Sequence, residues 1–90
     1  MKFIEKNIRA IATEQSYRQA ARIVLDAYIN RKYQLGLHEI PDSVEISSSL
    51  DELEVMIKEM LENDSFKSDE LLYYLNDMFD EDTMQNLIFD

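Results

Sequence analysis

The fold is decided by residues 49–82, which read SLDELEVMIKEMLENDSFKSDELLYYLNDMFDED. Leucine, isoleucine and methionine recur here every three or four residues, the spacing that places side chains on one face of a helix. The stretch also contains twelve acidic residues and two lysines, so its net charge (2 − 12 = −10) equals that of the whole chain. We therefore expect helices with one face in a core and a strongly negative face toward solvent.

Two helices are predicted within this stretch. The first covers residues 50–62, where Ser49 and Glu52 have the spacing of a capping box. The second covers residues 69–79, and Ser68 is expected to cap it. Their predicted buried residues are Leu53, Met56, Ile57, Met60 and Leu61 in the first helix, and Leu71, Leu72, Leu75, Met78 and Phe79 in the second.

Two further helices are predicted before this stretch, over residues 2–12 and 17–34. Ser16 can cap the longer one together with Gln19. If the two segments formed one straight helix, their apolar faces would point about 150° apart. A single helix could not bury both faces against one core, so a break is expected between Thr13 and Ser16.

The connection around residues 37–47 is predicted to be irregular. Pro41 cannot occupy a helix interior, and the alternation at residues 44–46 favours a short extended segment. Asp82 and Gln85 predict a short last helix, which would contain Met84, Leu87 and Ile88. The predicted fold class is therefore all-α, a compact bundle of four or five short helices, with residues 1–90 forming a single acidic helical domain.

Composition narrows the functional classes. The chain has no cysteine, which excludes disulfides and thiolate metal sites. No apolar run approaches the ~20 residues of a membrane span, and the charged N-terminal segment does not resemble a signal peptide. We expect a cytoplasmic protein with no membrane association. Its core is modest for its size, and formation of a homodimer could supplement it.

Catalytic and metal-binding signatures are weak. His38 is the only histidine, the chain has one glycine, and no nucleophile motif accompanies them. We therefore predict no enzyme activity and no cofactor. Four acidic residues near the C-terminus could suggest a divalent cation, but their spacing does not fit a calcium-binding loop and is typical of a solvated helix end. These residues are Asp77, Asp80, Glu81 and Asp82.

Charge is distributed unevenly along the chain. Residues 1–44 have a net charge of +2 (7 − 5), and residues 45–90 have a net charge of −12 (2 − 14). This imbalance argues against direct nucleic-acid binding by the basic residues of the first half, Arg18, Arg22, Arg31 and Lys32. Three i,i+4 ion pairs are expected instead: Glu5 with Arg9, Glu14 with Arg18, and Arg22 with Asp26.

The acidic residues of the two later helices gather opposite the apolar stripes. Val55 is at the centre of one acidic face and Tyr73 at the centre of the other, which is the pattern of a binding hot spot with a polar rim. The alternatives are that they are ordinary exposed side chains or that the first helices cover these faces. Tyr74 is expected at the core edge, with its hydroxyl reaching water. The predicted partner-binding residues are Asp51, Glu52, Val55, Glu59, Glu62, Asp69, Glu70, Tyr73, Asp77 and Asp80.

In size, charge and helical plan the chain resembles two groups of acidic inhibitors: immunity proteins that neutralise nuclease toxins, and nucleic-acid mimics that phages use against host proteins. The resemblance is one of type, without a shared motif, and transfers no residues. It favours a non-enzymatic inhibitor that occludes the basic, nucleic-acid-handling surface of a partner protein. The alternative is a self-associating structural or regulatory module whose acidity serves only solubility.

Overall fold

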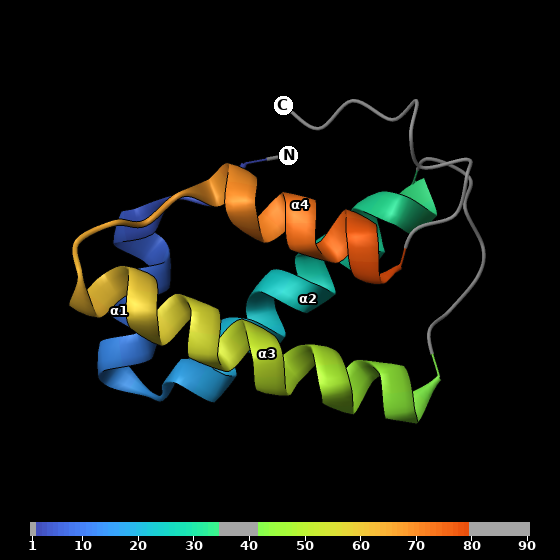
Figure 1. Ribbon diagram of the computed structural model, residues 1–90, viewed down its shortest axis with the longest axis horizontal. Helices are drawn as coiled ribbons and strands as arrows, with labels where there is room; N and C mark the ends of the chain where they lie inside the picture. The colour runs from blue at the N-terminus through green and yellow to red at the C-terminus, as the bar shows by residue number, and fades with distance from the viewer. Residues whose placement is uncertain (1, 35–41, 80–90) are drawn as a thin grey trace.

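The structure is a computed structural model that describes residues 2–34 and 42–79 (Figure 1). This part of the chain contains no strand and is built from four helices: α1 (Glu5–Glu14), α2 (Tyr17–Gln34), α3 (Ser43–Glu62) and α4 (Ser68–Met78). The predicted all-α bundle is therefore confirmed. The last helix expected at residues 82–85 and beyond lies outside the described residues.

The helix α2 is the central element of the bundle. It crosses behind α3 and α4 in Figure 1 and packs against α3 and α1. α3 and α4 run in opposite directions, and α4 lies beside the middle of α3. Its Asn76 also accepts a hydrogen bond from the hydroxyl of Tyr28 in α2, at 2.9 Å. The side chains that are fully buried between these helices include Val24, Leu25, Tyr28, Leu53, Ile57, Leu71 and Leu75.

The predicted break between the first two helices is present. α1 ends at Glu14, and α2 begins at Tyr17 after a turn. The Ser16 hydroxyl accepts a hydrogen bond from the Gln19 backbone N–H at 3.0 Å, as expected for a helix cap. The turn changes the direction of the chain. α1 can therefore bury Ile8 in the same core as α2, although the apolar stripes of the two segments would point apart on one straight helix.

The prediction for the start of α3 is wrong. The helix begins at Ser43, seven residues earlier than predicted, so residues 43–47 are not part of an irregular connection. Asp42 is the N-cap, and its carboxylate accepts the Glu45 backbone N–H at 2.8 Å. An aspartate followed three residues later by glutamate is itself a capping signal, which outweighs a three-residue alternation. Residues 37–41 lie outside the described part.

Ser49 therefore lies inside α3, where it cannot act as a cap. Its side chain is fully buried, and its hydroxyl donates a hydrogen bond of 2.7 Å to the Glu45 carbonyl oxygen. Such a bond to the preceding turn satisfies a buried serine within a helix. Ser49 and Glu52 thus have the spacing of a capping box, although no helix begins there.

Ser68 also has a different role from the predicted one. Lys67 is the N-cap of α4, and Ser68 is the first helical residue. The buried Ser68 hydroxyl accepts the backbone N–H of Phe3 at 2.7 Å, which ties the N-terminal segment to α4. Phe3 places its ring in the core, so α1 begins at Glu5 and not at residue 2 as predicted.

Candidate functional site

The predicted binding residues are exposed in the structure. Nine of the ten lie in the described part, and all nine face solvent: Asp51, Glu52, Val55, Glu59, Glu62, Asp69, Glu70, Tyr73 and Asp77. Asp80 lies outside the described residues. Val55 is 55% exposed and Tyr73 is 76% exposed, so neither is covered by another helix. Their exposure is confirmed, while their role in binding stays a prediction.

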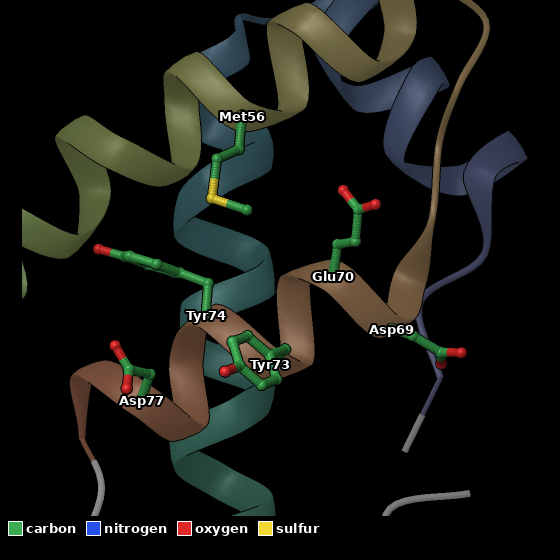
Figure 2. A pocket seen from close by; sticks show the side chains of 6 residues that line it. All are labelled: Met56, Asp69, Glu70, Tyr73, Tyr74 and Asp77. Atoms are coloured by element: carbon green, nitrogen blue, oxygen red, sulfur yellow. The ribbon is translucent and has the colours of Figure 1, made fainter.

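A surface hollow of about 540 Å³ lies between α3 and α4 (Figure 2). Met56 reaches into it from α3 and points toward Tyr74 and Tyr73 on α4. The remaining lining residues, also from α4, are Asp69, Glu70 and Asp77. The structure thus combines the four described α4 residues of the predicted site with two partly buried side chains, Met56 and Tyr74, that the sequence assigned to the core and its edge.

The α3 side of the hollow is also acidic. Glu52 precedes Met56 by four residues and Glu59 follows it by three, so all three lie on one flank of α3. Both glutamates are exposed. The hollow is therefore apolar inside and has carboxylates on the helix at each side. We name the hollow together with its lining residues the α3–α4 groove.

Asp51 faces the opposite flank of α3, toward α2. Its carboxylate lies 2.6 Å from the Arg18 guanidinium, which also approaches Glu54 at 3.5 Å. The hydrogen bond to Asp51 is the main cause that raises the pKa of Arg18 above its ordinary value. Arg18 was predicted to pair with Glu14, which is wrong because Glu14 ends α1 and Arg18 lies in α2, so the two are not one turn apart on the same helix. Arg18 pairs instead with two carboxylates of α3. Asp51 is consequently less available to a partner than the acids beside the groove.

The other predicted ion pairs differ in outcome. Glu5 and Arg9 form the expected pair on α1, at 2.9 Å, and Arg9 also reaches Asp64 at 3.3 Å. Arg22 and Asp26 are both exposed on α2, and no ion pair joins them in the described part of the chain. Exposed pairs of this kind add little to stability, because solvent screens them and ordering two side chains costs entropy.

Lysine neutralises the rim of the α3–α4 groove only in part. The exposed Lys67 lies 3.8 Å from Glu70, a separation at which a solvated pair contributes little. Lys58 lies on the outer surface of α3, three residues after Val55. Most of the acidic side chains on both helices therefore keep their charge toward solvent.

The Tyr74 hydroxyl differs from its prediction. Its oxygen is buried and makes no hydrogen bond to any described residue, although a hydroxyl reaching water was expected. The ring lies beneath α3, near Glu52 and Ser49. The hydroxyl is therefore covered by protein and does not reach the solvent. Burial, reinforced by the Glu52 carboxylate, raises the pKa of Tyr74 to about 12.

Replacement of Tyr74 by phenylalanine should test this environment. At neutral pH we expect a stability equal to that of the parent, or higher by up to about 1 kcal/mol, because a buried hydroxyl without a partner is removed. The folded-state pKa lies above the unfolded value, so Tyr74 ionisation opposes folding: stability is intact below pH 10 and falls as pH rises toward about 12. Urea unfolding across that range should show a smaller loss in Tyr74→Phe.

The matched control is Tyr73→Phe, which removes a hydroxyl from an exposed tyrosine on the next position of the same helix. It should leave the unfolding free energy at neutral pH unchanged. A loss of more than about 1 kcal/mol in Tyr74→Phe at neutral pH would show that the hydroxyl has a partner that stabilises the fold.

The described residues offer no other chemistry at this surface. No group of three histidine, cysteine, aspartate or glutamate side chains in residues 2–34 and 42–79 is arranged to hold a metal ion. His38 and the acids after Asp77 lie outside this part. None of the described helices combines the length and the hydropathy that crossing a bilayer requires.

Comparison of the chain with protein-family models, curated proteins and solved structures finds no match. The geometry and charge of the α3–α4 groove and of the acidic faces beside it therefore carry the information about function.

Proposed function

We propose that this protein is a non-enzymatic inhibitor that binds the basic, nucleic-acid-handling surface of another protein, in the manner of a nucleic-acid mimic or a nuclease immunity protein. The observation that carries the proposal is the exposure of acidic side chains on the adjacent helices α3 and α4, around the apolar interior of the groove. The carboxylates take the place of phosphates. We propose a cytoplasmic location as part of the same hypothesis.

Electrostatics supports a basic protein as the partner. A net charge of −10 on 90 residues attracts cationic surfaces over a distance of about 10 Å at moderate salt and repels nucleic acid and anionic membranes. Charge alone produces fast but short-lived encounters. Tyr73 and Val55, exposed among the acids, supply apolar contact area that loses water on binding and slows dissociation.

Self-association, the alternative, has less support. The apolar stripes of α3 and α4 are already used in the core, where Leu53, Ile57, Leu71 and Leu75 are fully buried. The outward faces have like charges, which repel when two copies bring the same surface together. A homodimer through these faces would have to overcome that repulsion with little apolar area. Light scattering at low and high salt separates the two hypotheses.

The proposal is tested by capture and competition. The full chain is immobilised, basic proteins are captured from a lysate at low salt, and each is assayed for displacement from DNA or RNA by the free chain. We expect competition with nucleic acid and weaker binding at high salt. Tyr73→Ala should raise the dissociation rate about tenfold or more, as loss of an aromatic hot spot does.

The control for this variant is Tyr33→Ala, which removes an exposed tyrosine from α2. It should leave the dissociation rate unchanged within about twofold. A captured partner that binds with equal affinity at all salt concentrations and does not compete with nucleic acid would refute the proposal. So would a stable dimer that binds no basic protein.

A further inference from the structure

We infer that the α3–α4 groove receives an arginine side chain from a basic segment of the partner. This inference depends on the proposed function and names the chemistry by which the groove would recognise its partner. The groove combines three features that a single side chain must match: an apolar interior, an aromatic ring at its wall, and carboxylates at its rim. Met56 and Tyr74 form the interior, Tyr73 provides the ring, and Glu70 and Asp77 provide the carboxylates.

The interior of the groove suits a long aliphatic stem. Met56 extends toward Tyr74 from across the groove, and both side chains are only partly buried. The hollow, of about 540 Å³, is open to solvent along one side and has more room than one small apolar side chain would fill. The methylene groups of arginine or lysine can cover this surface while the charged end stays at the rim.

The rim selects a cation. Glu70 points up toward α3 and Asp77 lies at the other end of the groove, and both line it (Figure 2). An apolar residue in the same place would cover part of the hollow without pairing with either carboxylate, and Glu70 has only the exposed Lys67 at 3.8 Å as a partner. A guanidinium can instead donate two parallel hydrogen bonds to one of the carboxylates. Charge complementarity therefore excludes acidic occupants and disfavours purely apolar ones.

The tyrosines favour arginine over lysine. Tyr73 lines the groove and presents a largely exposed ring beside the carboxylates. The planar guanidinium stacks on such a ring and is more weakly hydrated than an ammonium group, so it loses less on leaving water. Lysine can satisfy the charge but makes a poorer contact with the ring. The site should thus discriminate between the two cations.

The experiment uses the full chain with ¹³C-labelled methionine methyl groups and two synthetic peptides, one of arginine and alanine and one with lysine at each arginine position. Of the five methionines, Met56 reports on the groove, and Met60, one turn further along α3 and buried in the core, is the internal control. A Met56→Leu variant assigns the groove resonance. Peptide affinity and resonance positions are followed at low and high salt.

We expect the arginine peptide to shift the Met56 resonance, to leave Met60 in place, and to bind about three- to tenfold more tightly than the lysine peptide. Tyr73→Ala should weaken the arginine peptide by about fivefold and reduce the difference between the peptides. Asp77→Asn should weaken both peptides and keep the preference for arginine, because it removes a charge but not the ring.

Two results would overturn the inference, and they bear differently on the proposed function. If either peptide binds in a salt-dependent manner without moving the Met56 resonance, or if both bind equally well, the groove is not an arginine site, but an acidic surface for basic proteins remains. If neither peptide binds at low salt, both the inference and the proposed function fail.

Discussion

Replacement of Leu53 by alanine is expected to lower the free energy of unfolding by about 2–5 kcal/mol. Leu53 is in the middle of α3 and is completely buried where α3 meets the rest of the bundle. The substitution removes apolar contacts and leaves a cavity that rigid helices on several sides can close only in part. A domain of this size has a total stability of about 5–13 kcal/mol, so the loss is a large share of it.

Urea unfolding followed by circular dichroism measures this effect, with the slope of the transition checking that the unfolded state is unchanged. Val55→Ala is the control, because Val55 lies two residues further along the same helix and is 55% exposed. It should change stability by no more than about 0.5 kcal/mol. Equal losses in the two variants would contradict the arrangement of α3 in the bundle.

Reversal of two charges on the proposed binding surface is expected to slow association with a basic partner by about tenfold or more at low salt. The double variant Glu59→Lys, Asp77→Lys changes one exposed acid beside Met56 on α3 and one acid that lines the groove from α4. Both charges act during the encounter, before contacts form, so the association rate should fall much more than the dissociation rate changes. The dependence of the association rate on salt should also flatten.

The measurement is stopped-flow or surface-based kinetics over a range of salt concentrations, with the captured partner. Glu14→Lys, Asp26→Lys is the matched control: it changes the net charge by the same amount, through exposed acids on α1 and α2. Its effect on association should be clearly smaller. Equal slowing by both double variants would show that total charge, and not the surface of α3 and α4, governs the encounter.

Helices with strong local signals could be predicted from the sequence. The bounds of α2, Tyr17–Gln34, agree with the prediction, because a serine cap, a long apolar stripe and a break before it all coincide. Periodicity also placed Val55 and Tyr73 opposite the core stripes, but only the packing of the helices shows that no described helix covers them.

Local patterns misled the prediction where two of them competed. Ser49 and Ser68 both occupy positions where the sequence predicts a helix cap, yet both are buried. The Ser49 hydroxyl donates to the Glu45 carbonyl, and the Ser68 hydroxyl accepts from the Phe3 backbone N–H. The second of these bonds joins residues that are 65 positions apart in sequence, so no local pattern could show it. Asp42 and Glu45 have an equally good capping signal, but the adjacent Pro41 favours a loop.

The sequence by itself determined the helical class of this protein, the alternation of apolar and acidic faces, and the exposure of the acids, because these depend on spacing within one helix. Only the tertiary structure decided that α3 and α4 lie side by side and form a groove between them, that Met56 and Tyr74 line it, and that Arg18 pairs with Asp51. The physical reason is that the relative position of two helices depends on how their side chains interlock. Periodicity shows which face is buried and does not show which neighbour covers it.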